Sequence, residues 1–236
     1  MDLHKELNRL HTQLSNHMIK TNMAREYKPH ISLDSVNHDV DKGRFGEVYS
    51  NGYLAVDNFL QPYTLTQLNN FILTNMFKFA TPLGAHHLNV EFCNLIYEDI
   101  QSVYRELEEY TVDKSFFTFF GYKEDTHLQP NFYDGLQLEI WFTPEIFCID
   151  SSESGLHIFK ECNYNVIENA QNPFFQGVDI EDDVPISDIK VIPYAYNRAV
   201  FIYKKVSFTG KNMFQPEIYK KKASLTFLLK KSTGLV

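Results

Sequence analysis

The sequence predicts an α+β protein in which helices come first and then cover a pair of antiparallel sheets. Apolar residues recur at helical spacing in the first half of the chain, for example over residues 92–110. From Ser115 onward the pattern changes to short, aromatic-rich segments that alternate with period two and are separated by Pro, Gly, Asn and Asp. Helices followed by a run of strands are typical of α+β folds, and the strands here suit a jelly-roll type of sheet pair.

Composition and charge agree with this class and exclude some partners. The 236 residues are enough for one large domain, and the 20 Phe and 14 Tyr favour a β-rich core. The formal net charge of −8 repels phosphate backbones and anionic lipid surfaces. We therefore expect neither nucleic acid nor membrane as the main partner.

The cysteines and the first residues bear on localisation. Cys93, Cys148 and Cys162 are far apart, odd in number and form no Cys-x-x-Cys pair, which favours a reducing compartment. The beginning of the chain lacks the layout of a signal peptide, and no apolar run reaches transmembrane length. The expectation is a soluble, cytoplasmic protein.

The chain divides into an N-terminal amphipathic helix (1–24), a connecting segment (25–50) and one large domain (51–236). The helix carries a leucine stripe at a/d spacing, formed by Leu3, Leu7, Leu10 and Leu14. Such a stripe indicates either a docking or homodimerisation helix or a helix that lies over the protein's own core. Residues 25–50 are polar and non-periodic, as expected of a connection.

Within the large domain the first elements have local signals. A short strand is predicted at Tyr53–Val56, followed by a helix that begins near Thr64, with Gln67 completing a capping box. A second helix is predicted at about Phe92–Tyr110, with acidic residues on its outer face. The stretch 161–189, which contains an acidic run, reads as a long loop between strands.

Several segments in order carry a family resemblance. They are "GYLAVDNF", "IWFTPE", "SGLHIF", "VIPYAYNRAVF" and "KKASLTFLL", within residues 50–230. In these segments the chain resembles the double-stranded β-helix of the 2-oxoglutarate/Fe(II) oxygenases. The resemblance implies a cupin-like pair of sheets buttressed by the N-terminal helices.

The same resemblance implies a place for each iron ligand, and those places hold other residues. The family uses a His-x-Asp/Glu pair and a distant His to bind Fe(II). The distal position falls at Val206–Thr209 and the proximal pair at Pro130–Phe132, and neither stretch contains His, Asp or Glu. A looser register brings in His127 and Gln129, of which Gln129 is a neutral substitute for the carboxylate. The chain is thus similar to a divergent member with a degenerate triad.

The co-substrate position has a better match. The resemblance implies a cation near the last strand that binds a carboxylate, and here Lys221 or Lys222 stands at that place. In the predicted strand "LQLEIWF", the side chains of Gln137, Glu139 and Trp141 share one face. That face either lines the lumen, where ligands bind, or lets Gln137 and Glu139 point to solvent.

Two further residues have competing interpretations. Arg198, at a strand entry, either pairs with a carboxylate to hold the end of the sheet or binds a ligand. His157 is either a hydrogen-bonded strand histidine or, with His127, part of a rebuilt metal site. In such a metal site, Asp134, Glu139 or Glu161 would supply the carboxylate ligand.

Two functions follow from these observations, and enzymatic activity stays open between them. In the first, a protein of oxygenase fold without an iron triad or cofactor binds a small carboxylate ligand or a protein partner. In the second, the chain is an enzyme. It is then either a 2-oxoglutarate-dependent hydroxylase with Fe(II) at an atypical site around His127, or a metal-free catalyst in the same lumen.

Overall fold

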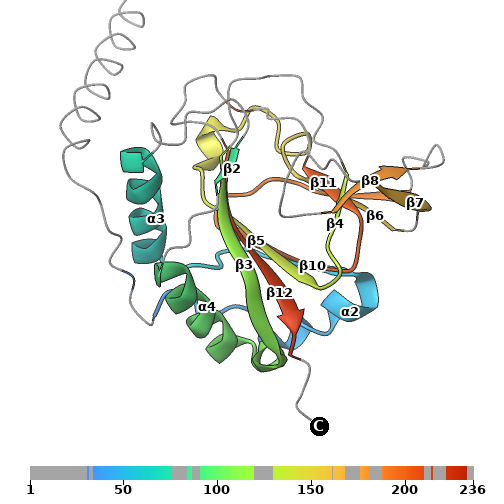
Figure 1. Ribbon diagram of the computed structural model, residues 1–236. Coiled ribbons are helices and arrows are strands. Elements are labelled where there is room, and N and C mark those ends of the chain that lie inside the picture. The colour runs from blue at the N-terminus through green and yellow to red at the C-terminus, as the bar shows by residue number, and fades with distance from the viewer. Residues whose placement is uncertain are drawn as a thin grey trace, which may run out of the picture.

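The protein is built from two six-stranded antiparallel sheets with helices against one of them (Figure 1). The computed structural model describes residues 31, 34–75, 84–86, 91–119, 130–160, 162–167, 176–180, 188–209, 214 and 222–232. The helices of these residues are η1 (Lys42–Arg44), α2 (Glu47–Asn51), α3 (Pro62–Asn75), α4 (Glu91–Val103), η2 (Arg105–Glu109) and η3 (Glu145–Phe147). The strands are β1 (Tyr53–Val56), β2 (Gly84–His86), β3 (Tyr110–Phe119), β4 (Asn131–Phe132), β5 (Leu136–Trp141), β6 (Leu156–Phe159), β7 (Tyr164–Ile167), β8 (Gln176–Ile180), β9 (Ile189–Ile192), β10 (Arg198–Tyr203), β11 (Ser207–Thr209) and β12 (Ala223–Lys231).

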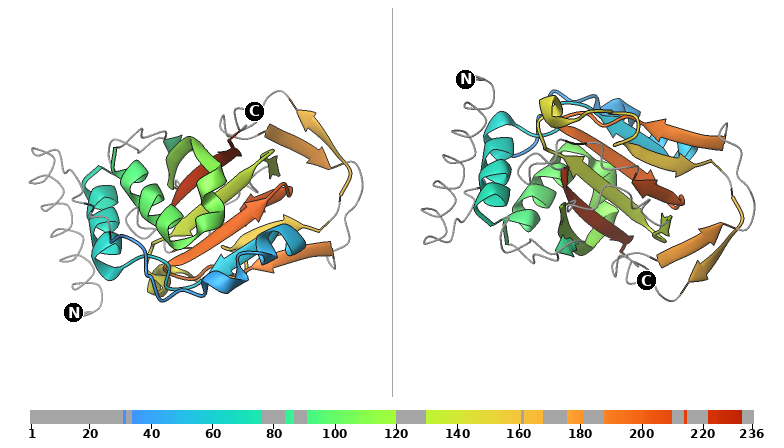
Figure 2. Two further views of the ribbon diagram at one scale, coloured as in Figure 1. Left: turned by 90° about the horizontal axis from the view of Figure 1, so that it is seen from below. Right: turned by 90° about the horizontal axis from the view of Figure 1, so that it is seen from above.

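The winding of the chain between the sheets defines the fold. The major sheet has the order β1-β10-β5-β12-β3-β2, and the minor sheet has the order β7-β8-β4-β11-β6-β9. The chain alternates between the sheets from β3 to β6 and again from β9 to β12, while β7 and β8 extend the minor sheet at the end of the molecule opposite α3 (Figures 1 and 2). This winding is a double-stranded β-helix, so the predicted fold class is confirmed.

The two faces of the major sheet bury different sets of side chains. Leu138 and Ile140 of β5 belong to a core shared with Leu68 of α3 and Ile96 and Ile100 of α4. The opposite face belongs to a second core, which contains Trp141, Leu156, Ile158, Val200 and Ile202. Because Leu156 and Ile158 lie on β6 of the minor sheet, this second core fills the space between the sheets, which we call the lumen.

The local predictions for the first elements are partly confirmed. The strand Tyr53–Val56 has the predicted bounds. The following helix begins at Pro62, two residues before Thr64, because proline suits the first helical position, where its missing N–H and fixed φ cost nothing. Thr64 consequently lies inside the first turn, and its Oγ1 is buried without a hydrogen-bond partner among the described residues.

Two longer predictions were wrong in detail. The predicted helix over Phe92–Tyr110 ends at Val103 and continues as the 3-10 turn η2. Leu107 is buried in η2, so an apolar residue at this spacing does not distinguish a 3-10 turn from a continued α-helix. The stretch 161–189 is not one long loop, because β7 and β8 pair within it at the edge of the minor sheet. The apolar Val166 is exposed there, so apolar residues do not mark only the buried face of β7, and the alternation that predicts a strand is weak.

Part of the expected connecting segment belongs to the core. Phe45 and Val48 are fully buried, and α2 ends at Asn51, so the expected boundary between residues 50 and 51 falls inside that helix. The predicted helix of residues 1–24 lies outside the described residues, and its role stays a prediction. Among the described helices, none is long and apolar enough to cross a membrane.

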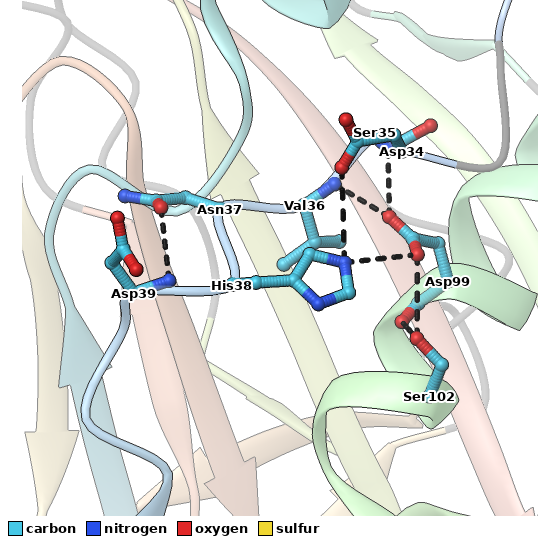
Figure 3. Close-up of polar contacts among 8 residues, drawn as sticks. All are labelled: Asp34, Ser35, Val36, Asn37, His38, Asp39, Asp99 and Ser102. Carbon is cyan, nitrogen blue, oxygen red and sulfur yellow. Dashed lines mark hydrogen bonds and ion pairs between the residues drawn. The ribbon is translucent and has the colours of Figure 1, made fainter.

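A buried carboxylate attaches the same segment to α4 (Figure 3). Oδ2 of Asp99 accepts hydrogen bonds from the backbone N–H groups of Ser35 (2.7 Å) and Val36 (2.6 Å). The half-exposed His38 places Nε2 3.5 Å from the other oxygen of Asp99. The chain is therefore held against the middle of α4 before it enters β1.

Candidate functional site

Alternate residues of β5 and β12 form a polar row on the lumen face of the major sheet. Cα registers place Trp141 opposite Ser224, Glu139 opposite Thr226 and Gln137 opposite Leu228. Gln137, Glu139, Ser224 and Thr226 are all buried. Of the two predicted environments for Gln137 and Glu139, lumen or solvent, the structure has the buried one.

Lys222, immediately before β12, extends this row and is fully buried, with 1% of its side chain exposed. Its Nζ donates a hydrogen bond to the carbonyl oxygen of Ser154 (3.2 Å). The same nitrogen lies 3.7 Å from Oε1 of Glu139, which accepts a short hydrogen bond from Nε1 of Trp141 (2.6 Å). An ammonium group and a carboxylate thus face each other in the lumen.

Two stacked aromatic rings form a wall beside the ammonium group. The rings of Trp141 and Tyr194 have centroids 5.2 Å apart and planes inclined by 20°. The Nζ of Lys222 lies 4.6 Å from the centroid of Trp141 and 5.8 Å from that of Tyr194, within the range of cation–π attraction. The hydroxyl of Tyr194 donates to the carbonyl oxygen of Thr143 (2.5 Å), which holds its ring in place.

Burial determines the electrostatics of Lys222. Loss of solvent lowers the pKa of its ammonium group below the ordinary 10.5, and the negative charge of Glu139 opposes that shift. A buried ammonium group needs polar or anionic partners to offset its lost hydration. The Ser154 carbonyl, Glu139 and the two ring faces are such partners.

Ser224 adds a buried hydroxyl group to this row. Its side chain is 1% exposed, and its Oγ has no hydrogen-bond partner among the described residues. Ser224 is two residues after Lys222 in the sequence and lies opposite Trp141. A buried hydroxyl of this kind favours a bound molecule that completes its hydrogen bonds. We call Glu139, Trp141, Tyr194, Lys222 and Ser224 the lumen cluster.

Arg198, the other cation among the candidates, has a different environment. Its Nε and Nη2 donate to the two carboxylate oxygens of Asp57 (2.5 and 2.9 Å), and its Nη1 donates to the carbonyl oxygen of Pro193 (2.6 Å). These contacts match the predicted structural role, in which an ion pair between Arg198 and a carboxylate holds the end of the sheet. They do not bring the guanidinium group into the lumen cluster.

The candidate metal ligands are not brought together by the described structure. His157 lies on β6 and stacks on Phe208 of β11, with ring centroids 4.7 Å apart. Asp134 forms an exposed ion pair with Lys204. His127, Gln129, Glu161 and Lys221 lie outside the described residues.

Sequence reasoning missed two members of the lumen cluster and one backbone contact. Tyr194 and Ser224 stand inside the segments "VIPYAYNRAVF" and "KKASLTFLL", so their signal was their position in these segments. Ser154 contributes only a carbonyl oxygen, for which no side-chain pattern exists. The position of this carbonyl group depends on the next residue, Gly155, which packs so closely that a Cβ atom there would overlap the carbonyl oxygen of Ile192.

Comparisons with known proteins show similarity in structure alone. No model of a known protein family matches the sequence, and no curated protein sequence matches it. Among solved structures, EvdO2 from Micromonospora carbonacea var. aurantiaca is 15% identical with a TM-score of 0.55, over 85% of this chain and 96% of that one.

Two further solved structures are more distant. A prolyl hydroxylase from Trichoplax adhaerens, in complex with a peptide fragment of the hypoxia inducible factor oxygen degradation domain, is 12% identical with a TM-score of 0.45. It covers 78% of this chain and 86% of its own. An oxidoreductase of the 2OG-Fe(II) oxygenase family from Burkholderia pseudomallei is 8% identical with a TM-score of 0.45, over 83% and 93%. The strand order and the likeness to EvdO2 together show that this chain has a double-stranded β-helix fold, as the sequence predicted.

Proposed function

We propose that the protein is a binding member of the oxygenase fold that lacks the iron triad and holds a small carboxylate ligand at the lumen cluster. The observation that carries this proposal is the complete burial of Lys222 between the Ser154 carbonyl and the stacked rings of Trp141 and Tyr194. A carboxylate in the lumen would accept hydrogen bonds from the ammonium group and from Ser224. Lysine would bind it as a point charge, without the two-pronged geometry of arginine.

The residues on two minor-sheet strands support the part of the proposal that concerns iron. β11 contains Ser207, Phe208 and Thr209, and β4 contains Asn131 and Phe132. None of these side chains is an imidazole or a carboxylate, which are the donors of the iron facial triad. These two strands therefore supply no donor for Fe(II). No group of three His, Cys, Asp or Glu residues suited to a metal occurs within the described ranges.

The iron half of the proposal is tested by metal binding. The full chain is purified without chelators, its iron content is measured, and Fe(II) is titrated anaerobically in the presence of 2-oxoglutarate. We expect no stoichiometric iron and no metal-to-ligand charge-transfer band. Stoichiometric Fe(II) with such a band, abolished by His127→Ala, would establish the alternative of an active oxygenase with an atypical site.

The carboxylate half is tested by ligand binding in the presence of EDTA. Thermal shift and calorimetry are carried out with amino acids, monocarboxylates and dicarboxylates. Lys222→Met and Lys222→Gln should each weaken carboxylate binding at least tenfold. The glutamine variant keeps a donor for Ser154 and Glu139, so it is informative even where the methionine variant fails to fold. Lys204→Met removes an exposed lysine and is the matched control. Unchanged binding in Lys222→Gln would refute the proposal.

A further inference from the structure

The buried charges of the lumen cluster balance each other. Only three charged side chains are buried within the described residues, namely Asp99, Glu139 and Lys222. Asp99 lies on α4, where its carboxylate accepts hydrogen bonds from the backbone of Ser35 and Val36. Among the described residues, the lumen therefore buries one charge of each sign, Glu139 and Lys222, and the two charges of the cluster sum to zero.

This balance restricts the ligand that the proposed carboxylate site can accept. A simple carboxylate would leave the cluster with one uncompensated negative charge, and a dicarboxylate such as 2-oxoglutarate would leave two. Burying a charge without a partner is unfavourable because the lost hydration is not replaced. Glu139, 3.7 Å from the Lys222 ammonium group, would also repel the incoming anion directly. A dianionic co-substrate therefore does not fit the charges of this cluster.

A ligand with one positive and one negative group fits both residues. The distance of 3.7 Å between Nζ of Lys222 and Oε1 of Glu139 exceeds that of a charge-assisted hydrogen bond. Each partner can therefore form a short bond to a ligand without breaking a short bond to the other. Ser224 is two residues after Lys222, and its hydroxyl lacks a partner among the described residues, so it is suited to donate to the carboxylate. The rings of Trp141 and Tyr194 attract a cation as they attract Lys222.

We propose that the ligand of the lumen cluster is a small zwitterion of the α-amino acid class. Its carboxylate binds Lys222 and Ser224, and its ammonium group binds Glu139 beside the ring of Trp141. This inference rests on the proposed carboxylate site and specifies the class of its ligand. Glu139 acts in it as the residue that selects a zwitterion over an anion.

The experiment compares amino acids with acids that lack only the ammonium group. The pairs are L-alanine and propionate, L-leucine and 4-methylpentanoate, and L-phenylalanine and 3-phenylpropionate, with succinate and 2-oxoglutarate as dianions. Calorimetry uses the full wild-type chain in EDTA, so this comparison does not depend on the folding of any variant. At least one amino acid should bind ten or more times more tightly than its matched acid and than both dianions.

Variants then assign the selectivity to Glu139. Glu139→Gln should weaken binding of the amino acid and strengthen binding of its matched acid, so that their ratio falls at least tenfold. Glu145→Gln changes an exposed glutamate on η3 and should leave the ratio unchanged. Ser224→Ala should weaken both members of the pair to a similar extent, because it contacts the group that they share.

The outcomes separate this inference from the proposed function. If a dianion or a simple acid binds as tightly as the amino acids and Lys222→Gln abolishes that binding, the zwitterion is refuted and the carboxylate site stands. The zwitterion is likewise refuted if Glu139→Gln leaves the ratio unchanged. If no carboxylate compound binds, the proposed function itself fails.

Discussion

Asn197 and Leu60 exchange two hydrogen bonds across a sequence separation of 137 residues. The side-chain oxygen of Asn197 accepts from the backbone N–H of Leu60 (2.8 Å), and its side-chain nitrogen donates to the carbonyl oxygen of Leu60 (2.9 Å). Asn197 has φ of 59°, a left-handed conformation that asparagine tolerates better than most residues. The next residue, Arg198, binds Asp57. The turn after β1 and the entry into β10 are thus joined by neighbouring side chains.

Replacement of Asn197 should separate its two contributions. Asn197→Gly keeps the left-handed backbone but leaves the buried Leu60 groups without partners, so we expect a loss of about 2 kcal/mol in the free energy of unfolding. Asn197→Ala should lose about 1 kcal/mol more, because a Cβ opposes the positive φ. Urea denaturation measures both values. Equal stabilities of the two variants would show that the backbone conformation carries no cost.

Gly155 should tolerate no side chain. A Cβ there would overlap the carbonyl oxygen of Ile192, which is backbone and cannot rotate away. Gly155→Ala should therefore cost about 2–4 kcal/mol or prevent folding. Gly46→Ala is the control, since a Cβ at Gly46 meets nothing within 4 Å. It should change stability by less than about 0.5 kcal/mol. A stable Gly155→Ala protein would contradict the close approach of the two chain segments.

The ion pair of Asp57 and Arg198 should contribute to acid sensitivity. Hydrogen bonds from Arg198 lower the pKa of the Asp57 carboxyl below the ordinary 3.8. The folded protein therefore binds this proton more weakly than the unfolded chain does. The stabilisation is complete above the unfolded pKa and is lost as the pH falls through the lower folded pKa.

Asp57→Asn should accordingly be less stable than the wild type at pH 6, by about 0.5–1 kcal/mol for a partly exposed pair. The difference should shrink as the pH falls below about 4, the ordinary range of an aspartate. Denaturation curves from pH 2 to 7 give this comparison. Arg198→Lys keeps the positive charge but not the paired hydrogen bonds of the guanidinium group. Its free energy of unfolding should lie between those of the wild type and Asp57→Asn. Parallel curves for wild type and Asp57→Asn would refute the prediction.

Removal of the Asp99 carboxylate should release the segment before β1. Asp99→Ala leaves the buried N–H groups of Ser35 and Val36 without their acceptor, with an expected cost of about 2–4 kcal/mol. Hydrogen exchange of these two amides should become faster relative to the rest of the chain. His38→Ala removes only the longer, half-exposed contact and should have little effect. If the amides exchange equally slowly in both variants, Asp99 does not hold the segment.

The two charges of the lumen cluster should show strong coupling in stability. Lys222→Met or Glu139→Gln alone leaves one buried group without its partner, and for the lysine change we expect a cost of about 3–5 kcal/mol. The double variant should be more stable than the sum of the single changes predicts. A complete double-mutant cycle by urea denaturation measures this coupling. Simple additivity would mean that the two side chains do not interact.

Much of the fold could be predicted because each residue's face is encoded locally. Alternation along "LQLEIWF" placed Glu139 and Trp141 on one face, and the structure has both in the lumen. The apolar spacing over residues 92–110 predicted a buried face, and Ile96, Ile100 and Leu107 at that spacing are buried. The exact start of α3 was not predicted, because proline at the first helical position extended the helix beyond the capping signal. The strands β7 and β8 were not predicted, because apolar and polar residues do not alternate clearly at this edge of the sheet.

The sequence by itself determined the change from helical to period-two patterning near Ser115, the two faces of β5 and the absence of His, Asp and Glu from β11. Only the tertiary structure decided that Lys222 meets Glu139 and that Tyr194 stacks on Trp141 beside them. These contacts depend on the register of β12 against β5 and on the close approach of Gly155 to the backbone of Ile192, which bring distant parts of the chain together. A local pattern encodes the direction of a side chain, but not which remote side chain it will face.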